Sequence, residues 1–247
     1  MKTNRNCMIG ILWKGFGAAL AAALLMTGCD AAASQPGLGS DARPRFVMAL
    51  VDETASFEPC WQKSLHAIGK VVESLGPNEA FGLIGIDDRG FDPEDVRVPI
   101  QVIDPAVLKA HRQKRAWAAN LATVQRRTHK RNYTDILGAV RHAAFFLNRQ
   151  PDRNPVLLIF SDMEQTPQMP AVADVDFQLA GGARVYCFFV NTSGWADRIG
   201  VSVGTSWDIV VGRWQSILSS AGASVTKGNF YQEGSILVEL PRLLARR

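Results

Sequence analysis

Two nearly unbroken apolar runs constrain the fold of this chain more than any other feature. Residues 156–160 read VLLIF and residues 184–190 read RVYCFFV, without the polar alternation of a strand that has one face in water. Strands of this kind are buried on both faces, as they are in parallel sheets that helices cover on each side. The two runs therefore predict the centre of a parallel α/β sheet.

Strand and helix signals alternate along the rest of the chain. Further strands are predicted at residues 46–51, 81–86 and 96–103, and Pro99 within the third suits a strand at a sheet edge. The predicted helices span residues 59–76, 104 to about 127, 134–148 and 205–221, followed by a short strand near Ser224 and a last helix from Ser235. We therefore expect one open, mostly parallel, doubly wound α/β domain over residues 45–247, with helices on both faces of the sheet.

The chain begins with the pattern of an export signal. Lys2, Arg5 and Lys14 lie in a segment without acidic residues, and the apolar run 15–26 follows it. This run is too short to span a bilayer comfortably and matches the core of a signal peptide. Removing residues 1–28 would remove three cations and no acid, so the net charge would fall from +4 to +1. The basic composition is therefore weak evidence for a nucleic-acid partner.

The apolar run ends in LMTGCD, residues 25–30, which resembles the bacterial lipobox, although Met26 stands where Leu is usual. The resemblance implies cleavage before Cys29, a lipid on that cysteine and a membrane-anchored protein of the cell envelope. Asp30 directly after it resembles the signal that keeps lipoproteins in the inner membrane, facing the periplasm. Residues 29–44 are small, polar and punctuated by Gly and Pro, which predicts a flexible tether. An ordinary signal peptide or an uncleaved anchor is the alternative.

Cys60 and Cys187 are the two cysteines of the predicted domain. In an exported protein they could form a disulfide, because compartments outside the cytoplasm permit one. The alternative is two separate buried thiols, since free cysteine is a common core residue. The place of Cys187 inside a predicted central strand favours separate thiols.

Small oxygen-bearing side chains follow two of the predicted strands. Asp52, Thr54 and Ser56 alternate where the chain turns from the first strand into a helix, and Asp162 follows a central strand. Thr134 opens another predicted helix. The carboxyl ends of parallel strands share one edge of the sheet, where ligands of such folds bind. Each of these residues alone could instead cap a helix or a turn.

In this order and on these elements, the five residues resemble the metal-ion-dependent adhesion site of von Willebrand factor A domains, whose fold is Rossmann-like. The resemblance covers residues 44–245. It implies that the three hydroxyls bind Mg²⁺ (or Mn²⁺ or Ca²⁺) directly and that the two carboxylates hold coordinated waters, in keeping with the oxygen preference of Mg²⁺. It also implies that an Asp or Glu of a protein partner completes the coordination. Two positions depart from the family: Thr54 replaces the usual Ser, and Met163 stands where Gly often follows the last Asp.

A basic run leads into Thr134. No acid lies between Asp104 and Asp135, and eight cations do: Lys109, Arg112, Lys114, Arg115, Arg126, Arg127, Lys130 and Arg131. A solvated helix face is one interpretation. The other is a patch near the metal edge that attracts an acidic partner or anionic headgroups. The cations lack aromatic interleaving beyond Trp117 and Tyr133, so a nucleic acid fits poorly.

No catalytic pattern competes with a binding function. The four histidines have no close ligand spacing, and no Gly-rich dinucleotide motif follows the first strand. No serine lies in a nucleophile elbow with a paired histidine, and an aspartyl phosphatase would want a second acid where Thr54 stands. We therefore expect a protein that is not an enzyme: a membrane-anchored module for cation-dependent protein–protein interaction. A metal-independent periplasmic scaffold is the first alternative, and a metal-dependent hydrolase is the second.

Overall fold

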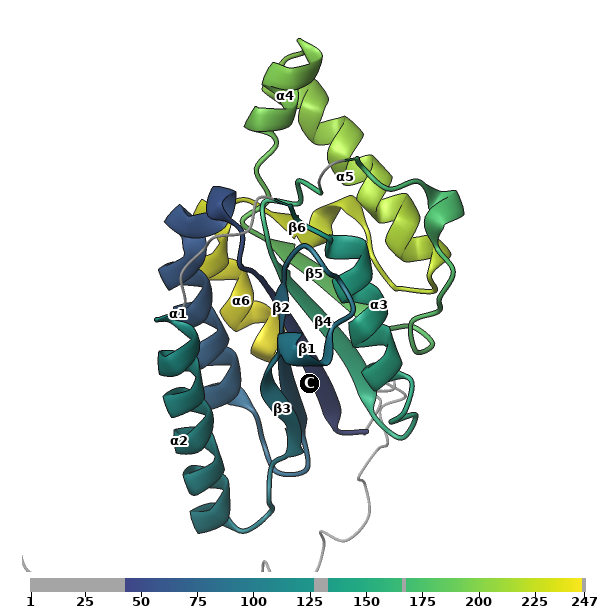
Figure 1. Ribbon diagram of the computed structural model, residues 1–247. Coiled ribbons are helices and arrows are strands. Elements are labelled where there is room, and N and C mark those ends of the chain that lie inside the picture. Colours follow the sequence, from purple (N-terminus) through teal and green to yellow (C-terminus); the bar gives the residue numbers. More distant parts are fainter. Residues whose placement is uncertain (1–42, 127–132, 166–167, 246–247) are drawn as a thin grey trace, which may run out of the picture. The chain divides into compact units, whose positions relative to one another are not determined.

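The computed structural model describes residues 43–126, 133–165 and 168–245, which belong to one compact unit beginning at Ser40 (Figure 1). The predicted signal peptide, the predicted lipidation site Cys29 and nearly all of the predicted tether lie outside the described residues. So do three cations of the basic run, Arg127, Lys130 and Arg131. Within the described ranges, no helix is both long and apolar enough to cross a membrane.

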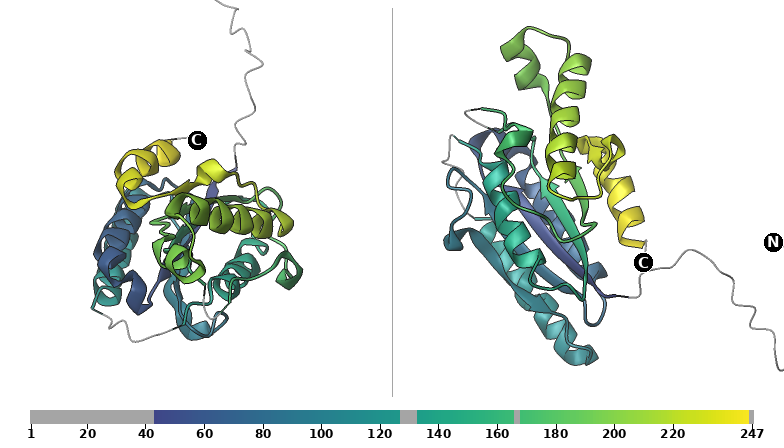
Figure 2. Two further views of the ribbon diagram at one scale, coloured as in Figure 1. Left: turned by 90° about the horizontal axis from the view of Figure 1, so that it is seen from above. Right: turned by 90° about the vertical axis from the view of Figure 1, so that its right-hand side faces the viewer.

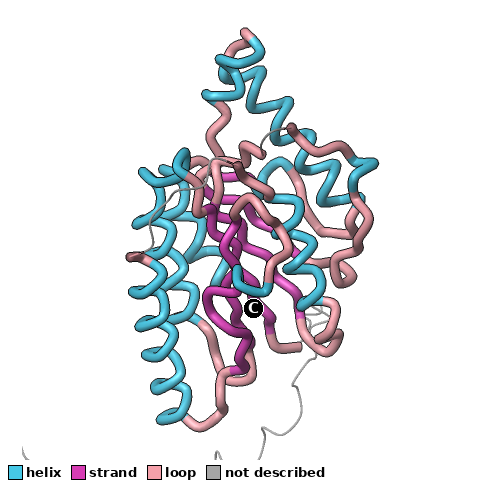
Figure 3. Tube along the Cα trace, viewed as in Figure 1, coloured by secondary structure: helices cyan, strands magenta, loops and turns pink. Residues whose placement is uncertain are grey.

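Six strands form a single sheet in the order β3-β2-β1-β4-β5-β6 (Figures 1 and 3). They are β1 Arg45–Asp52, β2 Ala80–Ile86, β3 Val96–Val102, β4 Asn154–Phe160, β5 Arg184–Phe188 and β6 Phe230–Tyr231. All neighbouring strands are parallel except β2 and β3. The predicted open, mostly parallel sheet is confirmed, and Pro99 lies in its antiparallel edge strand.

Helices cover both faces of this sheet (Figure 2). They are α1 Glu58–Ser74, α2 Val107–Val124, α3 Ile136–Leu147, α4 Ser193–Ile199, α5 Val203–Ser220 and α6 Ile236–Ala245. One core cluster joins the sheet to α3 and α5, and the other joins it to α1, α2 and α6. Alternate residues of β1 enter the two clusters, so every residue of this strand is buried. Burial on both faces is the reason that the central strands are apolar throughout.

Two helices begin later than the sequence predicts. Asp104 accepts the backbone N–H of Ala106 in a turn, and α2 starts only at Val107. The next helix, α3, starts at Ile136, with Asp135 as its N-cap. Local side-chain hydrogen bonds of Asp compete with helix geometry and move both boundaries.

The region after β5 differs more. The seven-residue helix α4 was not predicted, because one and a half turns are too short for an apolar period. Near Ser224 there is only an isolated bridge to Arg184, and the strand β6 begins at Phe230. The prediction of a strand near Ser224 was therefore wrong by about six residues.

Both cysteines of the domain are free thiols. Cys187 is fully buried in β5, and burial raises the pKa of its thiol. Cys60 lies in the first turn of α1 and is half-buried. The expectation of two separate thiols is confirmed.

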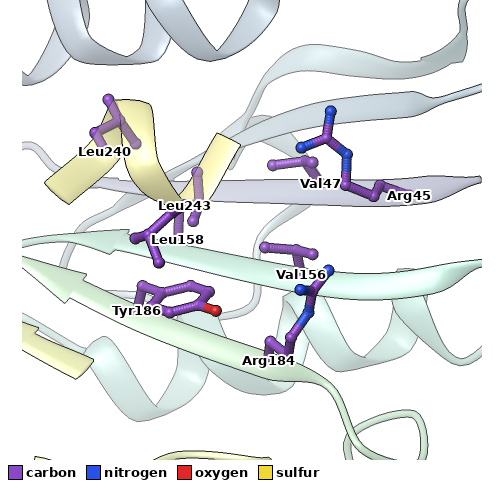
Figure 4. A pocket seen from close by; sticks show the side chains of 8 residues that line it. All are labelled: Arg45, Val47, Val156, Leu158, Arg184, Tyr186, Leu240 and Leu243. Carbon is purple, nitrogen blue, oxygen red and sulfur yellow. The ribbon is translucent and has the colours of Figure 1, made fainter. Parts of the chain in front are cut away.

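A small cavity lies between the sheet and α6 (Figure 4). Val47, Val156 and Leu158 lie beneath Leu240 and Leu243 of α6, and Arg45, Arg184 and Tyr186 complete the lining. Its volume is about 20 Å³, room for roughly one water molecule. It is a gap in the packing and not a ligand pocket.

Candidate metal centre

Asp52 ends β1 and is fully buried. Its Oδ1 accepts the backbone N–H of Thr54 at 2.9 Å and the Thr54 hydroxyl at 2.6 Å. Its Oδ2 accepts the hydroxyl of Ser161 at 2.8 Å. These hydrogen bonds fix the direction of both carboxylate oxygens at the carboxyl edge of the sheet.

Thr54 and Ser56 do not serve as helix caps. The short 3₁₀ turn Ala55–Phe57 and the helix α1 both begin without a side-chain cap. The hydroxyl of Thr54 lies 3.2 Å from that of Ser56. Thr54 is buried and Ser56 is exposed, so the row of oxygens runs from the buried Asp52 out to solvent.

Asp162 follows β4 and lies beside this row. Its Oδ1 accepts the backbone N–H of Glu164 at 2.9 Å, so it supports the local turn, as the capping alternative expects. The side chain of Ser56 lies close enough to this carboxyl group to favour its ionised form. Burial, and then the charge of Asp52, raise the pKa of Asp162 to about 7. The carboxyl groups at the ends of β1 and β4 therefore repel each other in an environment that is largely buried from solvent.

Thr134 belongs to the same edge of the sheet. The next residue, Asp135, donates its backbone N–H to the carbonyl of Asp87 at 2.8 Å, and Asp87 directly follows β2. The last residue of β2, Ile86, pairs with Asp52. Thr134 is buried, and its neighbour Asp135 is the N-cap of α3.

Ser161 is a residue that the sequence analysis missed. It is fully buried, donates its hydroxyl to Asp52 and accepts the backbone N–H of Met163 at 3.0 Å. It therefore joins the end of β1 to the turn that carries Asp162. A polar side chain directly after the apolar run 156–160 was the available signal.

A buried ion pair behind the site was also missed. Arg97 of β3 donates to both carboxylate oxygens of Glu53, each at 2.7 Å, and to Asp95 at 3.4 Å. Both partners of the pair are nearly buried. A Cβ at Gly85 would come within 2.7 Å of the Glu53 carboxylate. A glycine inside a buried strand marks such a close approach, and was the signal in the sequence.

Met163, which stands where the resemblance would place Gly, adopts a left-handed backbone conformation. Its φ is 64°, and its side chain is fully buried in the core. Its carbonyl accepts the indole N–H of Trp214 at 3.0 Å. The left-handed conformation costs a residue with a side chain about 1–2 kcal/mol, which the packing of Met163 offsets.

This balance predicts that the glycine variant at position 163 is more stable than the alanine variant, although glycine is the smaller residue. Met163→Ala should lower the free energy of unfolding by about 2–5 kcal/mol, because it empties a core position and retains the strain. Met163→Gly removes one more carbon but also the strain, so it should be the more stable variant by about 1 kcal/mol. Urea unfolding of both variants measures the difference. A glycine variant less stable than the alanine variant would contradict the role given to the backbone.

The cations of the basic run spread along α2. This helix starts at the end of β3, which pairs with the beginning of β2, and so it begins at the amino edge of the sheet, opposite Asp52. Lys109 forms an ion pair with Asp104 at 3.6 Å there. Lys114 donates to the carbonyls of Glu73 and Leu75 and so closes the end of α1. Arg112 and Arg115 are exposed on α2, and Arg126 follows its carboxyl-terminal end.

The donor set fits a small, hard cation. The described residues contain no group of three or more His, Cys, Asp and Glu that could hold a metal. The predicted set differs from such a group, because it has two carboxylates and three hydroxyls. Hydrogen bonds connect three of its members, Asp52, Thr54 and Ser56, and Asp162 lies close to Ser56. Oxygen-only donors of this kind suit Mg²⁺ better than a softer metal.

Comparison by sequence and by structure gives different results. No protein-family model matches the chain, and no curated protein matches it either. The structure is similar to the pilus adhesin SpaC from Lactobacillus rhamnosus GG in its open conformation. The TM-score is 0.52 at 11% identity, over 83% of this chain and 30% of SpaC. It is also similar to a von Willebrand factor type A structure from Catenulispora acidiphila, with a TM-score of 0.51 at 11% identity, over 82% of this chain and 42% of that one.

This chain therefore spans less than half the length of either structure. Sequence identities this low support a shared fold and do not transfer the function of the similar proteins to this chain. The mostly parallel six-stranded sheet with helices on both faces agrees with that likeness. The chain has the fold of von Willebrand factor A domains.

Proposed function

We propose that this chain is a membrane-anchored module that binds a protein partner through a divalent cation. The residues that would hold the cation are Asp52, Thr54, Ser56, Thr134 and Asp162. The observation that carries this proposal is the pair of buried, mutually repelling carboxyl groups of Asp52 and Asp162, which the exposed hydroxyl of Ser56 connects to solvent. Such a pair is unfavourable by itself and is stabilised by a cation.

The chemistry of the residues supports a recognition site. When bound, Mg²⁺ (or Mn²⁺ or Ca²⁺) supplies positive charge and a coordination position for an oxygen ligand. The hydroxyls offer neutral oxygens, and the two negative charges of the carboxylates equal the two positive charges of the cation. The partner would contribute an Asp or Glu side chain, which reaches the site from the solvent side at Ser56. Asp52 and Asp162 are held by hydrogen bonds from Ser161 and Glu164, so the oxygens are preorganised.

The pattern of the first thirty residues supports the anchor. A lipid on Cys29 would hold the domain at a membrane of the cell envelope, facing the periplasm, and Asp30 favours the inner membrane. The proposed role is assembly or adhesion and not catalysis. A metal-independent scaffold remains the competing proposal, and the experiments below separate the two.

Calorimetry tests the cation site directly. The chain from residue 30 onward, without lipid, is titrated with MgCl₂ and with MnCl₂. Wild-type protein should bind one equivalent of cation, and the Asp52→Ala, Ser56→Ala double variant should bind about a hundredfold more weakly or not at all. The matched control is Asp208→Ala, Ser216→Ala, which makes the same two changes on the exposed surface of α5. Equal affinity of the site variant and the control would rule out the proposed site.

Partner capture from envelope extracts, with and without a chelator, tests the second half of the proposal. A partner that is released by the chelator and lost in the double variant supports cation-dependent binding. A partner retained in both cases favours the metal-independent scaffold.

A further inference from the structure

The amino edge of the sheet carries the two most exposed large apolar side chains of the described residues. Val107 is 68% exposed and Leu108 is 75% exposed, and both lie in the first turn of α2. Figure 1 shows this end of α2 and the start of β1 at the lower end of the domain, away from α4, and the second view of Figure 2 agrees. Apolar side chains this exposed at the tip of a helix are available for contact with a partner or a membrane.

Cations lie along the same edge of the sheet as this apolar tip. Asn78 donates its N–H to the carbonyl of Ile103, and its own carbonyl accepts from the guanidinium of Arg153. Arg43 donates to the carbonyl of Pro151 at 3.1 Å. These contacts join the start of β1, the loop before β4 and the end of β3 into one surface. Its basic residues are Arg43, Lys109, Arg112, Arg149, Arg153 and Arg184.

Acidic residues are concentrated at the opposite edge. The carboxyl ends of the strands and the loops that follow them hold Asp52, Glu53, Asp87, Asp88, Asp92, Asp95, Asp162 and Glu164. The amino edge has fewer acids: Glu79 is engaged with Arg45 through two hydrogen bonds, Asp104 pairs with Lys109, and Asp152 is exposed beside Arg153 in the loop before β4. Arginines pair with several acids of the carboxyl edge as well, Arg89 with Asp92 and Arg198 with Glu164, but among the described residues acids still outnumber cations there and cations outnumber acids at the amino edge. A negative surface attracts the amino edge and repels the edge that carries the candidate metal centre.

The path of the chain leads to the same edge. The first described residue, Arg43, lies there, and residues 30–42 separate it from Cys29. Thirteen residues reach at most about 45 Å. A lipid on Cys29 would therefore keep the amino edge within this distance of the membrane, and this step alone rests on the proposed anchor. Tethering at short range raises the effective concentration of the surface for a weak contact.

We propose that the amino edge docks on an anionic lipid bilayer, with Val107 and Leu108 in the headgroup region and Lys109 and Arg112 against lipid phosphates. Docking in this orientation turns the candidate metal centre away from the membrane, towards a partner. The exposed apolar pair and the cations that follow it on one helix tip have the composition of an interfacial membrane contact.

Vesicle sedimentation tests docking without the lipid anchor. The chain from residue 30 onward retains every helix and strand described, since β1 begins at Arg45. It is mixed, in the presence of a chelator, with vesicles of phosphatidylcholine and phosphatidylglycerol, or of phosphatidylcholine alone. We expect binding to the anionic vesicles only, and weaker binding at higher salt.

Two pairs of substitutions identify the surface. Lys109→Glu with Arg112→Glu should weaken binding by at least about tenfold, because each cation near an anionic surface contributes about fivefold. Val107→Ser with Leu108→Ser should weaken it several-fold at unchanged charge. The control Arg213→Glu with Lys227→Glu makes the same charge change at exposed positions away from the amino edge, and should have less than about a third of that logarithmic effect. Circular dichroism checks that all variants remain folded.

Several results would overturn the proposal. Failure of the wild-type protein to bind anionic vesicles would overturn it. Equal weakening of binding by the control substitutions and by the α2 substitutions would also overturn it. Binding to DNA or to an acidic protein, with none to vesicles, would replace the bilayer by another polyanion. The Asp52→Ala, Ser56→Ala variant should bind vesicles like the wild type, so failure of the cation proposal and failure of docking are read separately.

Discussion

Arg97→Ala should lower the free energy of unfolding by about 3–5 kcal/mol, because it removes the guanidinium that neutralises the buried carboxylate of Glu53. The guanidinium of Arg97 donates two hydrogen bonds to Glu53 and one to Asp95, and its side chain is only 5% exposed. Glu53 lies between Asp52 and Thr54, so the loss reaches the backbone of the candidate metal centre. Urea unfolding measures the change as a lower midpoint.

The pH dependence of this loss distinguishes a charge effect from lost packing. Burial, followed by the charge of Asp87, raises the pKa of Asp95 to about 6 even with Arg97 present. Without Arg97, the folded-state pKa of Asp95 should rise further above its unfolded value. The destabilisation is then fully present at high pH and diminishes as the pH falls and Asp95 takes up a proton.

Arg242→Ala is the matched control. Arg242 pairs with Glu239 at 3.0 Å, but its side chain is 65% exposed. Its loss should cost less than about 1 kcal/mol at any pH. A deficit of Arg97→Ala that is small, or independent of pH, would contradict the account of a buried ion pair.

Gly90→Ala should destabilise the domain by about 3 kcal/mol or more, through backbone strain and overpacking together. Gly90 has a φ of 62°, and a Cβ there would lie 1.9 Å from Oδ2 of Asp135 and 2.9 Å from Cα of Gly138. The loop after β2 therefore presses directly on the first turn of α3. Neither the backbone of Gly138 nor the capping side chain of Asp135 can move aside without disturbing that turn.

Gly200→Ala provides the control, because Gly200 has a similar φ of 68° and no atom within 4 Å of an added Cβ. It should cost only the left-handed strain, about 1 kcal/mol. The difference between the two variants in urea unfolding therefore measures the clash alone. Equal losses of unfolding free energy in the two variants would show that the contact between the loop and α3 adjusts to the added Cβ without a measurable cost.

The same clash should reach the candidate metal centre. Asp135 donates to the carbonyl of Asp87 and lies directly after Thr134. Moving Asp135 therefore moves Thr134, and calorimetry on Gly90→Ala, under conditions where it is folded, should show weaker binding of Mg²⁺. Gly200→Ala should bind the cation like the wild type.

Local patterns predicted the fold class well. The apolar runs at 156–160 and 184–190 gave the central strands, and the alternation of strand and helix signals gave a mostly parallel sheet. Pro99 identified the edge strand. Element ends were less predictable, because Asp104 and Asp135 form local hydrogen bonds that delay α2 and α3. The short helix α4 has too few residues for a periodic signal.

The sequence by itself determined the chemistry that this protein can offer: acids and hydroxyls at the ends of buried strands, in an order that resembles a known cation site. Those features depend on residue type and on short-range sequence patterns, so they can be read from the sequence without the tertiary structure. Only the tertiary structure decided that Thr54 and Ser56 point to carboxylates instead of capping a helix, and that Ser161 joins β1 to β4. It also decided that Met163 takes a left-handed conformation and that Arg97 neutralises Glu53. The contacts of Ser161 with Asp52 and of Arg97 with Glu53 join residues far apart in sequence, so packing of the whole core fixes them.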